Sequence, residues 1–118
     1  MADVEARVEL NCLLDFYGPL LTAHRREVLR LYCEEDLSLQ EIADQLGITR
    51  QGVSDALNKG RRQLSEYEQK LGLAGRYRAL GEEAKRCMDE LRGVRAEGED
   101  RQRIHRAEEA LQNILRER

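Results

Sequence analysis

The sequence predicts an all-α fold of five or six helices, with a helix-turn-helix at its centre and a C-terminal helical extension. The composition supports this class, because 36% of the 118 residues are charged and only 4% are aromatic. Sheets favour aromatic and β-branched side chains instead. Apolar residues recur at helical spacing along most of the chain, and caps and glycines separate the helical stretches.

The first helix is expected over residues 4–17. Gly18-Pro19 ends it, because proline disfavours helical backbone in the residue before it. The apolar residues at helical spacing in this stretch are Leu10, Leu13, Leu14 and Tyr17. Asp15 stands among them and Glu9 directly precedes them, so this pattern predicts a helix with one buried face.

A second helix is expected from the N-cap residue Thr22 to about Cys33. Its apolar residues Val28, Leu29 and Tyr32 face one way. Four charged residues face out, namely Arg25, Arg26, Glu27 and Arg30. The acidic run at residues 34–36 would oppose the helix dipole at a C-terminal end, so we assign it to a turn.

A helix-turn-helix is predicted over the next two elements. Ser38 and Glu41 form a capping box that begins a short helix, and Gly47 ends that helix in a left-handed conformation. Ile48 packs inward and Thr49 caps the following helix, so only about three residues separate the two helices. The predicted motif is similar to that of winged-helix proteins but lacks a wing.

The second helix of the motif is predicted to cover residues 50–71, well beyond the length that a recognition helix needs. At about 1.5 Å per residue it spans roughly 33 Å, and Gly72 marks its end. Its inner residues step by four and three, which is a heptad seam. The seam residues are Val53, Leu57, Gly60, Leu64, Tyr67 and Leu71.

The expected core joins the apolar faces of these four helices. Ala43 is small because the two helices of the motif approach each other closely there. The predicted core residues are Leu13, Leu14, Tyr17, Leu21, Val28, Leu29, Tyr32, Leu39, Ile42, Ala43, Leu46, Ile48, Val53, Leu57 and Leu64.

Residues 73–118 are predicted to form a charged helical extension, separate from a helix-turn-helix domain at residues 1–72. The apolar residues on either side of a break at Gly93–Gly98 are Leu73, Tyr77, Leu80, Ala84, Cys87 and Leu91, then Ile104, Ala107, Leu111 and Ile114. Two narrow seams joined by a flexible link predict a helical hairpin or one arm of an oligomer. They either pack within the chain or contact a second copy or another partner.

The stretch from Thr49 to Leu64 is locally basic, in a chain of net charge -3. Its Arg, Gln, Asn and Ser residues are of the types that hold phosphates or read base edges, and they cluster early in the motif's second helix. Asp55 is the exception, because a carboxylate repels phosphate. The predicted nucleic-acid contacts are Arg50, Gln51, Ser54, Asn58, Arg61 and Arg62, with Arg25 and Arg26 as backbone clamps. The alternative is an ordinary solvated face.

The sequence argues against an enzyme. His24 and His105 have no nearby Ser, Cys or Asp at catalytic spacing, and no glycine loop for a phosphate or dinucleotide is present. Cys12, Cys33 and Cys87 form no CxxC pair and no cluster with histidine, so neither a zinc site nor a disulfide framework is expected. We expect no metal and no cofactor.

The cysteines are expected to be buried or half-buried thiols in a reducing cytosol. The N-terminal residues lack the basic start and apolar stretch of a signal peptide. No apolar run approaches the roughly 18 residues that a membrane span requires. The protein is therefore expected to be soluble and cytoplasmic, without membrane contact.

The centre of the chain contains the segments LTAHRREVLRLY (residues 21–32) and LSLQEIADQLGITRQGVS (residues 37–54). Over residues 20–65 the sequence resembles the region-four helix-turn-helix of bacterial sigma factors. Sigma-like reading helices often carry a basic or small polar residue where this chain has Asp55. That departure argues against promoter recognition and leaves room for an RNA or protein ligand.

A more specific match adds LDFYGPLLT (residues 14–22), RQGVSD (residues 50–55) and EYEQKL (residues 66–71). Over residues 10–72 the chain resembles the YlxM family of small bacterial helix-turn-helix proteins. That resemblance implies a regulatory role in the signal recognition particle pathway, with the particle's RNA and its GTPase as partners. It implies no enzymatic activity.

Three functions remain open from the sequence. The first is a nucleic-acid-binding accessory protein of the signal recognition particle. The second is a sequence-specific DNA-binding regulator that forms a homodimer through its C-terminal helices. The third is a protein-interaction module, in which the seam of the first C-terminal helix is the working surface.

Overall fold

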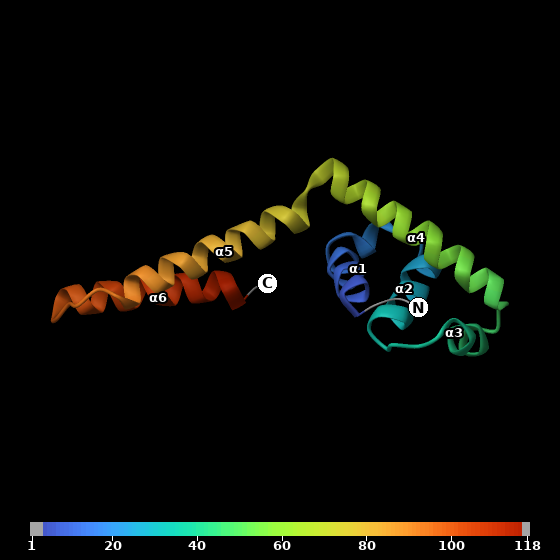
Figure 1. Ribbon diagram of the computed structural model, residues 1–118, viewed down its shortest axis with the longest axis horizontal. Helices are drawn as coiled ribbons and strands as arrows, with labels where there is room; N and C mark the ends of the chain where they lie inside the picture. Colours follow the sequence, from blue (N-terminus) through green and yellow to red (C-terminus); the bar gives the residue numbers. More distant parts are fainter. Residues whose placement is uncertain (1–3, 117–118) are drawn as a thin grey trace. The chain divides into compact units, whose positions relative to one another are not determined.

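The computed structural model describes residues 4–116, and this part of the chain forms six α-helices and one short 3-10 helix (Figure 1). The helices are α1 (Val4–Tyr17), α2 (Ala23–Cys33), α3 (Leu39–Leu46), α4 (Arg50–Leu71), α5 (Leu73–Arg92) and α6 (Glu99–Arg116), and η1 (Gly18–Leu20) joins α1 to α2. No strand occurs within residues 4–116. The predicted all-α fold is therefore confirmed.

The chain divides into two compact units, Met1–Ala74 and Gly75–Arg118. The first contains the helix-turn-helix, and the second contains most of α5 together with α6. The expectation that the N-terminus is no signal peptide concerns residues 1–3 in part, and these lie outside the described residues. Within residues 4–116, no helix combines the length and the apolar character needed to cross a bilayer.

The core of the first unit lies where α4 packs against α1, α2 and α3. Most of the predicted core residues are buried, and Leu10, Leu31 and Ala56 join them. Four predicted core residues are only partly buried and pack against the edge of the core, namely Leu13, Leu39, Leu46 and Ile48. They belong to α1, α3 and the α3–α4 turn, where one side of each residue packs against the core and the other side is open to solvent.

The seam of α4 is buried along its first part and ends before the helix does. Val53, Leu57, Gly60 and Leu64 are buried, and Tyr67 is half-buried. Leu71 is 56% exposed, so the prediction that it belongs to the inner face is wrong. The reason is length, because α4 extends past the helices that cover its first four turns.

In the second unit, α6 folds back along α5 (Figure 1), and Arg92 pairs with Glu108 across the hairpin at 4.0 Å. The predicted seam is wrong in register by one residue at several positions. On α5, Gly81 and Met88 are buried, whereas Leu80 is 55% exposed and Cys87 is exposed.

The same shift occurs on α6, where Glu108 and Leu115 are half-buried while Ala107 and Ile114 are exposed. One residue turns a helix by about 100°. The pairs Leu80-Gly81 and Cys87-Met88 offer an uncharged side chain or glycine in either register. The position of the neighbouring helix, rather than hydropathy, therefore decides which member faces inward.

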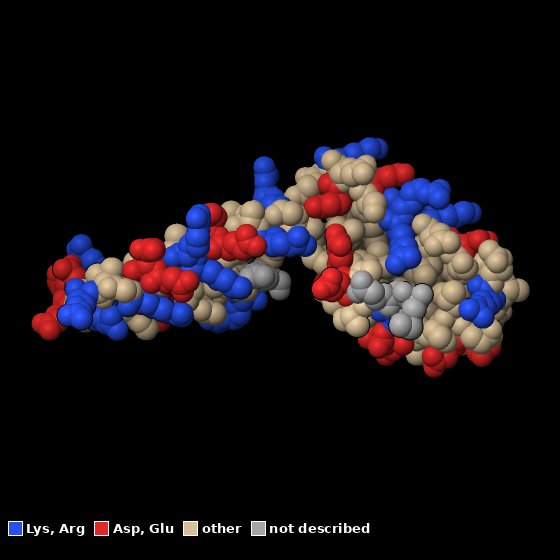
Figure 2. All heavy atoms as spheres, viewed as in Figure 1, with Lys and Arg blue, Asp and Glu red and all other residues tan. Residues whose placement is uncertain are grey.

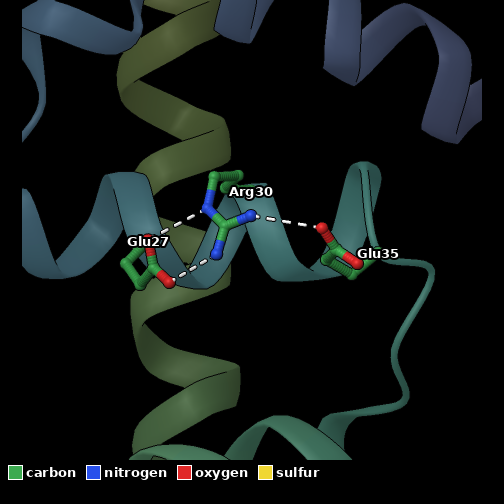
Figure 3. A network of polar contacts seen from close by, with 3 residues as sticks. All are labelled: Glu27, Arg30 and Glu35. Atoms are coloured by element: carbon green, nitrogen blue, oxygen red, sulfur yellow. Dashed lines mark hydrogen bonds and ion pairs between the residues drawn. The ribbon is translucent and has the colours of Figure 1, made fainter.

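A bidentate ion pair orders the end of α2 (Figure 3). The Nε and Nη2 atoms of Arg30 donate to the two carboxylate oxygens of Glu27 at 3.1 and 2.7 Å, and Nη1 donates to Glu35 at 3.3 Å. These bonds lower the pKa of the Glu27 carboxyl, with the Arg30 hydrogen bonds as the largest cause. Residues 34–36 form the predicted turn, and Asp36 there has a φ of 58°.

Within the first unit, the Tyr17 hydroxyl links α1 to the end of α4 and to the first residue of α5. Its hydroxyl donates to Glu68 Oε1 at 2.5 Å and accepts from the Leu73 N–H at 3.0 Å, while Glu68 Oε1 also accepts from the Ala74 N–H at 3.1 Å. The first N–H groups of a helix have no partner within it. Here the N–H groups of Leu73 and Ala74 donate to the side chains of Tyr17 and Glu68 instead. Burial and the Glu68 carboxylate both raise the pKa of the Tyr17 hydroxyl.

Replacing Tyr17 with phenylalanine is expected to lower the free energy of unfolding by about 1–3 kcal/mol, because it leaves partners of a buried hydroxyl unsatisfied. The matched control is Tyr67→Phe, since the Tyr67 hydroxyl makes only an exposed 3.5 Å bond to the Leu20 carbonyl. Urea denaturation of both variants measures the difference. Equal losses in the two variants would contradict the role given to the Tyr17 hydroxyl.

Candidate nucleic-acid interface

The helix-turn-helix begins with a complete capping box. Ser38 Oγ accepts from the Glu41 N–H at 3.1 Å, and Glu41 Oε1 accepts from the Ser38 N–H at 3.1 Å. This second bond is the main reason that the pKa of the Glu41 carboxyl is lowered. The box fixes where α3 starts.

The turn between α3 and α4 has the predicted form. Gly47 has a φ of 68°, which permits the tight left-handed turn, and the Ile48 N–H donates to the Ala43 carbonyl at 3.1 Å. Thr49 Oγ1 accepts from the Gly52 N–H at 2.9 Å and caps α4. The predicted helix-turn-helix is confirmed, with α4 as its second helix.

Four exposed polar residues form a row along the outward side of α4, and we call Gln51, Asp55, Asn58 and Arg62 the outer row. They step by four, three and four residues, and so do four buried residues of the same helix that we call the inner row, namely Val53, Leu57, Gly60 and Leu64. Because the two rows are offset by two residues, the helical repeat places them on opposite sides. The outer row therefore faces solvent while the inner row fixes the helix on the core.

The other three predicted contact residues lie on one flank of the outer row. Arg50 is exposed at the start of α4, and Ser54 and Arg61 are half-buried. Ser54 and Arg61 thus stand at the rim between the outer row and the core. The six residues share one side of α4, but only Arg50 and the members of the outer row are fully open to solvent.

Asp55 is paired within the outer row. Its Oδ1 atom accepts from the Gln51 Nε2 amide at 3.0 Å, and the two side chains are one helical turn apart. Both are exposed. The carboxylate that interrupts an otherwise basic or neutral face therefore has a defined partner, and Gln51 has a defined orientation.

The opposite rim of α4 contains a contact that the sequence did not reveal. Arg25 Nη1 donates to Gln63 Oε1 at 2.6 Å and links α2 to α4. Arg25 is half-buried and Arg26 is exposed. Gln63 lies outside the predicted contact set, and no local pattern could have identified it, because its partner is 38 residues away.

Gly60 sets the distance between α4 and α2. A Cβ atom at this position would lie 2.6 Å from Leu29 Cδ1 and 3.4 Å from Leu29 Cγ. Leu29 is fully buried. The glycine therefore lets the two helices approach at the level of Arg61 and Arg25, which stand on the two flanks of α4.

Replacing Gly60 with alanine is expected to destabilise the protein, although alanine favours helices by about 1 kcal/mol over glycine. Overpacking against Leu29 costs about 1–3 kcal/mol. A double-mutant cycle with Leu29→Ala, followed by urea denaturation, measures the coupling. We expect the alanine at position 60 to be better tolerated once Leu29 is truncated. A stabilised single variant would show that the contact is unimportant.

The cysteines differ in their surroundings. Burial raises the pKa of the Cys33 thiol to about 11, and the nearby positive charges of Arg7 and Arg61 only partly oppose that rise. Cys12 is half-buried like Cys33, but Cys87 is exposed, so the expectation that all three are at least half-buried is wrong. Cys87 is exposed because its neighbour Met88, rather than Cys87 itself, lies on the inner face of α5.

Lys and Arg side chains gather over the middle of α4 on the face shown in Figure 2, with acidic side chains around them. No group of three metal-binding side chains occurs in the described part of the chain. The arrangement offers exposed donors, one paired carboxylate and a rigid helix. The exposed donors can hold phosphates and contact base edges.

The chain is similar to one family of proteins along nearly its whole length. Residues 4–109 match the model of family UPF0122, described as "Putative helix-turn-helix protein, YlxM / p13 like". A UPF0122 protein of Acetivibrio thermocellus is 38% identical over 110 residues, which cover 91% of this chain and 94% of that protein. A UPF0122 protein of Symbiobacterium thermophilum is 41% identical over 111 residues, or 94% of each chain.

Proposed function

Because the chain belongs to the UPF0122 family of YlxM/p13-like helix-turn-helix proteins, we propose that it binds nucleic acid through the outward side of α4. The outer row carries this proposal. Its side chains are polar and exposed, lie on the second helix of the motif, and are backed by a buried inner row. The N-terminal residues of such a helix are the ones that reach base edges in helix-turn-helix proteins.

Duplex DNA is the ligand that this geometry favours. The major groove of B-DNA is wide enough to admit an α-helix, whereas that of A-form RNA is deep and too narrow for side chains to read. Arg50 and Gln51 stand in the first turn of α4, with Ser54 and Asn58 in the next turns. Arg61 and Arg62 follow further along and are placed to contact phosphates.

Two narrower proposals concern partners. The family relationship is the basis for proposing a regulatory role in the signal recognition particle pathway, with the particle's RNA or its GTPase as ligand. Exposed Leu80 and Ile114 in the second unit are the basis for proposing a homodimer formed through α5 and α6. A dimer predicts two DNA half-sites separated by about one helical turn or a multiple of it. We propose no enzymatic activity.

The experiment is a binding titration of the full chain at one stated, near-physiological salt concentration. The ligands are a pool of genomic DNA fragments, signal recognition particle RNA, and that RNA with its GTPase. Preference for particular DNA fragments supports a DNA-binding regulator, and preference for the RNA or its complex supports the targeting role. If neither nucleic acid binds, the proposed function is wrong.

A further inference from the structure

We propose that Asp55 is a positioning residue that orients Gln51 to read an adenine in the major groove of duplex DNA. This inference rests on the proposed function, and it names the base that one residue of the same surface recognises. It also assigns a role in base recognition to the Asp55 carboxylate, whose negative charge otherwise only weakens phosphate binding by this face.

The hydrogen bond within the outer row determines what Gln51 can offer to a ligand. One amide N–H of Gln51 donates to Asp55 Oδ1 at 3.0 Å. Among the residues that the structure describes, neither the second N–H nor Oε1 of Gln51 has a recorded partner. Gln51 therefore presents one donor and one acceptor side by side, in an amide plane that Asp55 holds.

A neighbouring donor and acceptor match adenine. In the major groove, adenine shows an acceptor at N7 and a donor at its N6 amino group, and glutamine pairs with both. Guanine shows two acceptors there and cytosine one donor, so neither satisfies both groups of Gln51. A bidentate pair of this kind discriminates between bases by about 5- to 150-fold.

The position of Gln51 suits this role. It is the second residue of α4, directly after the capped turn, and it is exposed. The first residues of the second helix are the ones that contact bases in this motif. A side chain that is fixed on binding loses conformational entropy. The hydrogen bond to Asp55 already restricts Gln51 in the unbound protein, so less entropy is lost when Gln51 contacts a base.

The chain contains a matched pair that serves as a control. Gln40 Nε2 donates to Asp44 Oδ1 at 3.0 Å on α3, with the same spacing of four residues. All four side chains are exposed. If the Gln–Asp pair only supported its helix, changes at Asp44 and Asp55 would have equal effects on base preference.

The test is selection of bound sequences from a random duplex DNA pool by the full chain and its variants. We expect the wild type to enrich adenine at one position, and Asp55→Ala and Gln51→Ala each to lose at least 5-fold of that preference. Asp55→Ala should still bind the pool, and more tightly at low salt, because a negative charge has left the face. Asp55→Asn, which keeps the acceptor oxygen, should keep the preference, as should Asp44→Ala.

The outcomes separate the inference from the proposed function. If the wild type binds duplex DNA and Asp55→Ala keeps the full adenine preference, the inference is wrong and the proposed function stands. The same holds if Asp44→Ala loses as much preference as Asp55→Ala. If the wild type binds no duplex DNA, or prefers an RNA hairpin pool under the same conditions, adenine reading in a major groove is overturned as well.

Discussion

Replacing Arg61 and Arg62 together by alanine is expected to lower the affinity for duplex DNA about 10- to 100-fold at near-physiological salt, from two lost charge-assisted contacts. Each phosphate contact contributes about -0.9 to the slope of log K against log salt. The slope should therefore become shallower by about 0.9–1.8 units. Arg62 is exposed in the outer row and Arg61 stands at its rim, so Arg62 should account for more of the loss.

The measurement is fluorescence anisotropy with a labelled duplex at several salt concentrations. Arg101→Ala with Arg103→Ala is the matched control, because it removes the same charge from two exposed residues of α6 in the second unit. A nonspecific charge effect would lower affinity equally in both double variants. That result, or unchanged affinity and slope in the α4 variant, would remove Arg61 and Arg62 from the interface.

Leu64→Ala is expected to lower the free energy of unfolding by about 2–5 kcal/mol, from lost burial and the cavity left behind. Leu64 is fully buried in the seam of α4, among core residues from α1 and α2. Domains of this size are stable by only about 5–15 kcal/mol. The variant should therefore lose a large share of its stability, and urea denaturation measures it.

Leu71→Ala is the control for that experiment. It makes the same chemical change on the same helix, one heptad later, at a residue that is 56% exposed. The loss there should stay within about 0.5 kcal/mol, as for most surface substitutions. Similar losses at both positions would mean that the core extends to the end of α4, contrary to the structure.

The helix boundaries could be predicted because their signals are local. Ser38 with Glu41, Thr49, Gly47 and Gly72 each act through hydrogen bonds or backbone conformation within a few residues. The inner face of α4 was also predictable, because neither Val53 nor Leu64 has an apolar side chain next to it in the sequence that could take its place: Gly52 and Ser54 flank Val53, and Gln63 and Ser65 flank Leu64. Where two acceptable residues are adjacent, as at Cys87 and Met88, hydropathy cannot choose between them.

In the candidate site, too, the features that depend on helical periodicity could be predicted from the sequence, whereas those that depend on how two helices pack could not. The outer row follows from helical periodicity once the inner row is known, and Gln51 is four residues from Asp55, a spacing at which helical side chains meet. The link between Arg25 and Gln63 depends on how α2 crosses α4, so it required the structure. The half-burial of Arg61 likewise required the structure.

The central claim is that the outward side of α4 is the surface that contacts nucleic acid. Its most direct test is a set of amide NMR spectra of the isotope-labelled full chain, recorded as a duplex selected from a DNA pool is added. The account predicts that the largest shift changes fall on residues 50–62, with smaller ones at the start of α2. Changes confined to α5 and α6, or an unchanged α4 in a bound complex, would contradict it.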